Sequence, residues 1–139
     1  MRNYKTWYST AIVFQFITAA VHSLSFLNTP VPQNAQERVL FDLMRNYRRD
    51  LAGMHVSTEE LMLALSACFT LLYLFGGLLN NFLLRRSQDT NLHRGVLWIN
   101  VLVFGICFVL MALFTFWPPI ILTGLVWLFL CLALITIQR

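Results

Sequence analysis

Four long apolar runs, joined by shorter polar stretches, fill most of the chain. None of them carries Asp, Glu, Lys or Arg in its interior, and each is about 18 to 24 residues long. An α-helix of that length crosses a hydrocarbon core about 30 Å thick. We therefore expect membrane-spanning helices over residues 6–27, 59–84, 95–117 and 119–138.

The stretch between the first two runs has a different pattern. Asn34 followed by Glu37 has the spacing of a helix N-cap, and we expect Gly53 to end this helix. In between, apolar residues recur every three or four positions, at Leu40, Leu43, Met44, Tyr47 and Leu51. The pattern predicts an amphipathic helix over 34–52 that lies on the outer membrane surface or caps the bundle, with docking of a partner protein as the alternative.

Two boundaries carry strong local signals. Ser57 and Glu60 have the spacing of a capping box at the start of the second span, which assigns Glu60 a structural role. The last two spans are joined only by Trp117, Pro118 and Pro119, so the two helices must be antiparallel neighbours. We predict an all-α integral membrane protein, in which residues 1–139 form one up-down bundle of four transmembrane helices with one amphipathic extracytoplasmic helix.

Composition supports the membrane assignment. The chain is 58% hydrophobic and 12% charged, whereas soluble domains are about 25% charged. Cations dominate the side of the termini, where Asp89 is the one acid: Arg2, Lys5, Arg85, Arg86, Arg94 and Arg139. The positive-inside rule then places both termini in the cytoplasm and the protein in the inner membrane of a bacterium. No basic stripe interleaved with aromatics suggests nucleic-acid binding.

The first span carries an ordered set of polar residues. Gln15, Thr18, His22 and Ser25 are spaced by three or four positions and share one helical face. A polar face in lipid turns toward neighbouring helices, because an unpaired donor in hydrocarbon is costly. We expect this stripe to face the bundle and to form a polar network or bind a ligand.

His22 is the one residue well inside a span that titrates near neutral pH, which makes it a candidate for function. Three interpretations stay open. A neutral His22 forms a hydrogen bond to a neighbouring helix; it handles protons or binds a headgroup, quinone or other amphiphile; or it ligates a metal or tetrapyrrole. No second His lies in a span, so a bis-histidine haem is not expected.

Counting depth along the spans brings further polar and aromatic residues together. Gln15, Tyr73, Cys107 and Trp127 fall near the midplane, where they line a small lipophilic pocket or pack as core around a Gln–Tyr hydrogen bond. Residues expected to serve helix packing are Gly76 and Gly77, which allow close approach, and Asn80 and Asn100, which have similar depths.

Signals for metal binding and catalysis are weak. His22, His55 and Glu59 are the only metal candidates, and none has the spacing of a metal site. One cysteine falls in each of the last three spans, as expected of core residues. No nucleophile elbow, P-loop, dinucleotide fingerprint or H-E-x-x-H motif occurs. We therefore expect no metal and no enzymatic activity, and no cofactor is indicated.

A resemblance adds to this interpretation. The stretch Phe16 to His22, Met44 and Gly53 in the long loop, and the Gly76-Gly77 pair resemble small bacterial four-helix membrane proteins whose activities are uncharacterised. More distantly, the chain is similar to the DoxX-like group, four-helix proteins associated with quinone and thiosulfate oxidation or with terminal oxidases. Ala20 and His22 replace the Gly-then-Lys pattern of that group, so no functional residue is carried over.

The function expected first is that of a non-catalytic accessory subunit, which packs against a larger membrane complex, such as a bioenergetic one. The chain is small and almost wholly within lipid, which leaves little room for a catalytic set. The alternative is a binder or redox handler of a lipophilic small molecule, such as a quinone, on the polar face of the first span. A small transporter or channel is a third hypothesis, disfavoured because the spans offer little polar lining.

Overall fold

The computed structural model describes residues 2–27 and 30–137, with side chains from Tyr4 onward. Four long helices form the bundle: α1 (Arg2–Ser23), α3 (Thr58–Arg86), α4 (Thr90–Phe114) and α5 (Trp117–Ile137). A 3-10 turn, η1 (Leu24–Phe26), extends α1. A shorter helix, α2 (Ala35–Asn46), and a hairpin of β1 (Arg48–Leu51) and β2 (Met54–Ser57) follow. Thr29, residue 138 and Arg139 lie outside the described residues.

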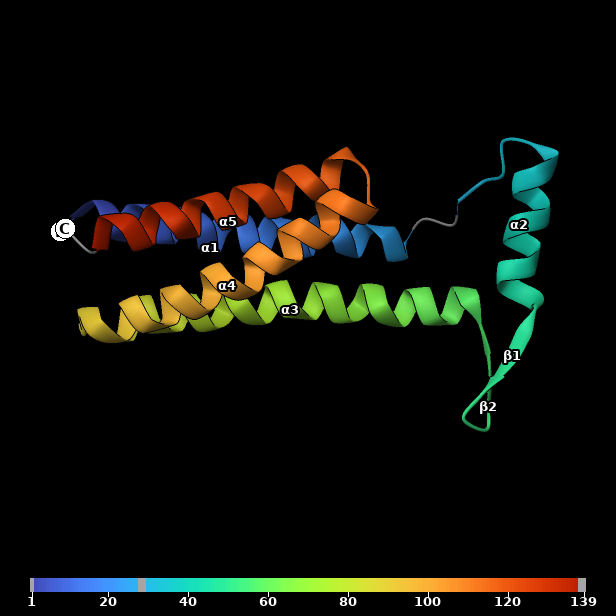
Figure 1. Ribbon diagram of the computed structural model, residues 1–139, viewed down its shortest axis with the longest axis horizontal. Coiled ribbons are helices and arrows are strands. Elements are labelled where there is room, and N and C mark those ends of the chain that lie inside the picture. The colour runs from blue at the N-terminus through green and yellow to red at the C-terminus, as the bar shows by residue number, and fades with distance from the viewer. Residues whose placement is uncertain (1, 28–29, 138–139) are drawn as a thin grey trace.

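The long helices alternate in direction, which is the up-down arrangement expected from the sequence (Figure 1). Helix α1 packs between α3 and α5, and α4 packs mainly on α5. Helix α4 starts beside the end of α3 and crosses toward α5, so α3 and α4 diverge. Helix α2 lies across the far end of the bundle, which we call the α2 end; the opposite end, where α1 begins and α5 finishes, is the terminal end.

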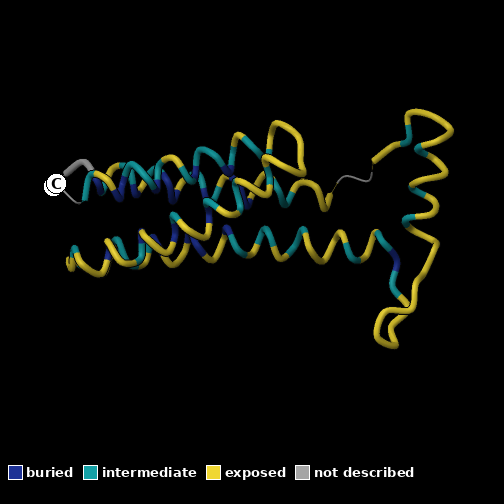
Figure 2. The backbone as a smooth tube through the Cα atoms, viewed as in Figure 1, coloured by how far each residue is buried: buried dark blue, intermediate teal, exposed yellow. Residues whose placement is uncertain are grey.

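Burial is concentrated away from the α2 end (Figure 2). The buried residues of α3 are Tyr73, Gly76, Gly77 and Asn80, all in its second half. The first half of α3 is exposed at Leu65 and Leu71, where α4 has diverged from it. The bundle is therefore closed toward the terminal end and open toward the α2 end.

Four of the described helices are long and apolar enough to cross a membrane. Their exposed faces carry large apolar side chains, among them Phe75, Leu102 and Leu113. Burying such faces in lipid removes the cost of hydrating them. The chain is thus a multi-pass membrane protein in contact with a lipid bilayer.

The amphipathic helix is shorter than the expected range of 34–52. Asn34 does cap α2, since its side chain accepts a hydrogen bond from the Glu37 amide at 2.8 Å. However, α2 ends at Asn46, and an antiparallel hairpin takes the following residues. Gly53 does not end a helix: it lies with Ala52 in the hairpin turn, and both have positive φ, at 84° and 51°. Positive φ at both central residues is the geometry of a two-residue type I′ turn.

Two connections at the ends of the spans are tighter than expected. The cytoplasmic loop expected around Arg85 to Arg94 shrinks to three residues, because α4 already begins at Thr90. The Asp89 side chain caps α4 by accepting from the amides of Asn91 and Leu92. At the other end, α4 and α5 are joined by Thr115 and Phe116 and not by Trp117 to Pro119, because α5 already begins at Trp117. Pro118 lies in the first turn of α5, where its missing N–H has no intrahelical partner to lose.

Candidate functional site

A closed hydrogen-bond network holds three helices together in the middle of the bundle. Asn80 is fully buried, and its side-chain amide donates to Asn100 Oδ1 at 2.9 Å and to Gln15 Oε1 at 3.1 Å. Its oxygen accepts from the Tyr8 hydroxyl at 2.8 Å and from the Asn100 amide at 3.1 Å. Asn80 thus links α1, α3 and α4, and we call these four side chains the Asn80 network.

A second buried contact lies closer to the terminal end and is centred on His93, which is fully buried. Its Nε2 is 3.2 Å from the Leu83 carbonyl oxygen, and its Nδ1 is 3.3 Å from the Tyr4 hydroxyl. A carbonyl only accepts, so Nε2 donates to it and the neutral ring accepts from Tyr4. We expected His93 in the loop before the third span and no second histidine within a span, but α4 begins at Thr90 and includes His93.

Toward the α2 end, α1 and α3 carry buried polar atoms that lack a hydrogen-bond partner among the described residues. They are Gln15 Nε2 and His22 Nε2 on α1, and Thr70 Oγ1 and Tyr73 Oη on α3. Gln15 and Tyr73 are 0% exposed. An unpaired polar group in such surroundings costs about 1–3 kcal/mol, so these positions are unusual in a relaxed core.

The polar stripe of α1 does not act as one network. Thr18 is buried, but its hydroxyl donates to the Phe14 carbonyl of its own helix at 2.7 Å. Ser25 is exposed rather than facing the bundle, and its hydroxyl donates to the His22 carbonyl at 2.6 Å. Among the described residues, Gln15 alone of these four forms a side-chain hydrogen bond to another helix, whereas His22 packs among aromatic rings.

His22 lies near the α2 end with its ring against two phenylalanines. The ring centroids are 4.7 Å from Phe69 on α3 and 6.1 Å from Phe26 in η1. These contacts explain why His22 Nε2 is out of contact with water and without a partner. Phe26 contacts the His22 ring and also lines the pocket described next.

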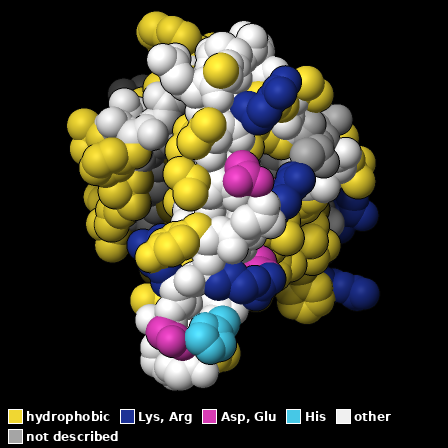
Figure 3. Space-filling view, turned by 90° about the vertical axis from the view of Figure 1, so that its right-hand side faces the viewer, with side chains coloured by type: hydrophobic (Ala, Val, Ile, Leu, Met, Phe, Trp, Pro, Cys, Tyr) yellow, Lys and Arg dark blue, Asp and Glu magenta, His cyan; other side chains and the backbone are white. Residues whose placement is uncertain are grey.

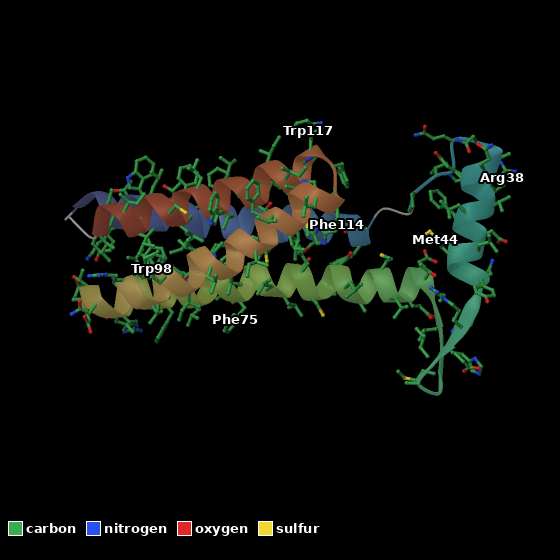
Figure 4. The ribbon with its side chains drawn as sticks, viewed as in Figure 1. Arg38, Met44, Phe75, Trp98, Phe114 and Trp117 are labelled. Atoms are coloured by element: carbon green, nitrogen blue, oxygen red, sulfur yellow. The ribbon has the colours of Figure 1, made fainter. Side chains whose placement is uncertain are left out.

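A pocket of about 470 Å³ lies between α2, the end of α1 and the start of α3. We call it the α2 pocket. Figure 4 shows Met44 on the side of α2 that faces the bundle and Arg38 away from it. Charged, hydroxyl and apolar side chains all line the cavity: Ser25, Phe26, Pro30, Phe41, Met44, Arg45, Glu59, Glu60, Met62, Leu63 and Ser66.

Two ion pairs fasten α2 and the hairpin to the start of α3. Arg45 binds Glu59 through two hydrogen bonds of 2.9 and 3.1 Å, and Arg48 binds Glu60 at 2.8 Å. The hydrogen bond and charge of Glu59 raise the pKa of Arg45, which therefore stays protonated. Glu60 also completes the expected capping box, accepting from the Ser57 amide at 2.8 Å. Figure 3 shows Lys, Arg, Asp and Glu side chains on the face of the α2 end, with hydrophobic side chains beside them.

Because α2 has no buried residue, the ion pairs should control how firmly it is attached. We predict that Arg45→Glu makes hydrogen exchange of the 35–46 amides about two- to five-fold faster, since two like charges then face each other. The double variant Arg45→Glu with Glu59→Arg should restore slow exchange, and Arg38→Glu should leave it unchanged. Equally fast exchange in the double variant would refute a direct pairing.

The structure separates Trp127 from the other midplane candidates. Tyr73 packs between Phe69 and Phe104, with ring centroids 4.8 and 4.9 Å away. Trp127 instead stacks on Phe108 at 5.6 Å and lines an apolar groove of about 690 Å³ along α4. Gln15 and Tyr73 lie in the α1–α3 region, so no single pocket contains all of the expected midplane residues.

The two glycines of α3 permit close packing. A Cβ on Gly76 would lie 2.6 Å from Phe104 Cζ and 3.0 Å from Gln15 Nε2. A Cβ on Gly77 would meet the Phe16 ring at 3.1 Å. These distances show that α1 and α4 both approach α3 at this level.

The metal candidates do not come together. His55 Nδ1 lies 3.2 Å from Asp50 on the exposed hairpin, while Glu59 is paired with Arg45. Within residues 2–27 and 30–137, no group of three or more His, Cys, Asp or Glu side chains is arranged to hold a metal ion.

Comparison of the chain with family models, with curated proteins and with solved structures finds no match. The supported part of the sequence-based resemblance is therefore the architecture, four long apolar helices in a small membrane protein.

Proposed function

We propose that this membrane protein binds an amphiphilic small molecule in the α2 pocket. The observation that carries the proposal is the mixed lining of the pocket at one end of the transmembrane bundle. Arg45 and Glu59 lie on its α2 and α3 walls, and Met62 and Leu63 continue the α3 wall into the span. A ligand with a polar head and an apolar body fits a site with this gradient.

The position of the pocket supports the same conclusion. It lies where α1 gives way to η1 and where α3 begins, which is the level of a membrane–water boundary. Amphiphiles of a bilayer place their polar groups at this level. The first half of α3, next to the pocket, exposes Leu65 and Leu71, so a ligand would approach from the lipid along this face.

We propose that a molecule bound in the α2 pocket also contacts His22. Its unpartnered Nε2 lies behind Phe26, which lines the pocket, and Thr70 presents an unpartnered hydroxyl on α3. A rotation of the Phe26 ring would bring a ligand acceptor or donor within reach of the imidazole. This retains the hypothesis that the α1 face binds a lipophilic molecule, with the entrance at the α2 end.

We propose that the α2 end faces the outside of a bacterial inner membrane. Lys5, Arg85, Arg86 and Arg94 all lie toward the terminal end, where the Lys5 ammonium donates to Gln88 at 3.1 Å. The positive-inside rule assigns that end to the cytoplasm. The ligand would then come from the outer leaflet of that membrane.

The proposal predicts that Phe41→Ala lowers the amount of ligand that co-purifies. Phe41 lines the pocket, whereas Leu40 on the same helix is 52% exposed and does not line it. Lost apolar contact should weaken binding about ten-fold. Wild type, Phe41→Ala and Leu40→Ala are purified in the same detergent, and extracted small molecules are quantified by mass spectrometry. Equal retention by all three proteins would count against the α2 pocket.

The accessory-subunit role expected from the sequence is a second proposal. Its supporting observation is the groove along α4, whose lining is apolar and includes Trp98, Leu102 and Trp127. A single transmembrane helix of a partner would fill such a groove by van der Waals packing. The test is purification from native membranes: stoichiometric partners lost on Leu102→Trp support this role, and a chain recovered without partners contradicts it.

A further inference from the structure

We infer that the α2 pocket takes a zwitterionic lipid headgroup, one that carries a cation and an anion at once. The inference rests on the proposed function and deepens it by naming the class of ligand. It follows from the way in which charges of both signs are arranged at the rim of the pocket.

The rim is electrically balanced. Arg45 and Glu59 both line the pocket and pair with each other, and the third charged lining residue, Glu60, is neutralised by Arg48, which lies outside the lining. An anionic headgroup would be attracted by Arg45 but repelled by Glu59, because the Glu59 carboxylate lies within hydrogen-bond distance of the Arg45 guanidinium. A cationic headgroup would be attracted by Glu59 but repelled by Arg45. A net charge of either sign therefore gains little at this rim.

Only one of the two pairs is free to change partners. Glu60 is committed twice, because one oxygen accepts from Arg48 and the other completes the capping box with Ser57. Glu59 has no role in that capping box, and among the described residues its side chain is hydrogen-bonded to Arg45 alone. The Arg45 and Glu59 side chains are 55% and 47% exposed and both line the pocket. A headgroup can reach this pair from the water side.

A zwitterion can satisfy both members of the pair. Its phosphate accepts from the Arg45 guanidinium, whose planar donors suit bidentate binding, and its ammonium donates to the Glu59 carboxylate. The single Arg45–Glu59 pair is then replaced by two pairs, with no charge left unpaired. The acyl region of the lipid lies along Met62 and Leu63.

The test compares three photoreactive lipids that share the same acyl chains, each with a diazirine in one chain. They are phosphatidylethanolamine, phosphatidylglycerol and diacylglycerol, each presented at 5 mol% (about a twentieth of the lipid) in phosphatidylcholine-free nanodiscs of uncharged glycolipid. The readout is labelling of the peptide that holds Met62 and Leu63, relative to the lipid-facing peptide around Leu102. We expect phosphatidylethanolamine to label the pocket at least about three-fold more than either other lipid.

Two variants sharpen the result. Glu59→Gln leaves an unpaired cation at the rim and should reverse the order in favour of phosphatidylglycerol. Asp50→Asn removes an acid that lies on the hairpin and does not line the pocket, so it should keep the wild-type order. Equal pocket labelling by all three lipids would overturn the headgroup inference alone. Labelling of the pocket no stronger than labelling around Leu102 would overturn the proposed function with it.

Discussion

Asn80→Ala is expected to destabilise the bundle by about 2 kcal/mol. Asn80 is the one residue bonded to Tyr8, Gln15 and Asn100. Each side-chain bond between helices in a membrane contributes about 0.6 kcal/mol, and the three partners would lose a bond together. The three partners are buried, so water cannot replace the hydrogen bonds that they lose.

The measurement is thermal unfolding in detergent, followed by helical circular dichroism. Asn81→Ala is the matched control, since Asn81 is adjacent on α3 but accepts only from Arg85 near the surface. The control should keep the wild-type transition within about 1 °C while Asn80→Ala lowers it by several degrees. Equal transitions for the two variants would show that the Asn80 network does not hold the helices together.

Gly76→Val is expected to cost about 1–3 kcal/mol through overpacking. The first added carbon already lies 2.6 Å from Phe104 Cζ and 3.0 Å from Gln15 Nε2, and Phe104 is itself buried. To accept the side chain, the buried Phe104 ring and the Gln15 amide must shift, and Gln15 belongs to the Asn80 network. The substitution should therefore weaken packing and the network at once.

Gly95→Val on α4 provides the comparison, because a Cβ there meets nothing within 4 Å. Both variants replace Gly by Val within a helix, so the change in helix propensity is the same in the two proteins and does not contribute to their difference. Thermal unfolding of the two proteins should differ by several degrees, with Gly76→Val the less stable. If Gly95→Val were as damaging as Gly76→Val, close approach of α3 and α4 would not be the cause.

The spacing of apolar residues predicted most of the fold, because a membrane leaves a long uncharged run few structures other than a spanning helix. Spans without internal charge have few alternatives in lipid, and the capping signals of Asn34 and Ser57 are local. The hairpin was missed because Tyr47 and Leu51 continue the helical spacing of α2, while its strands alternate too briefly to compete. The left-handed turn at Gly53 looks, in sequence, like the end of a helix.

The candidate site was only partly predictable. His22 and Gln15 were singled out by their chemistry, yet Ser25 turned outward because α1 gives way to a 3-10 turn after Ser23, where helical spacing no longer applies. The rim of the α2 pocket depends on the Arg45–Glu59 pair, and in the sequence the whole hairpin lies between these two residues. In the sequence Glu59 is only a metal candidate beside the capping box, and its pairing with Arg45 appears only once the hairpin brings α2 onto α3.

The central claim, an amphiphile bound beneath α2, is tested most directly by site-specific photo-crosslinking in native membranes. A benzophenone amino acid replaces Met44, which lines the pocket, or Leu43, which is exposed on α2 and does not. We predict that position 44 captures one class of amphiphile of defined mass, while position 43 captures a mixture that follows bulk lipid composition. The same bulk mixture at both positions, or no adduct at position 44, would contradict the account.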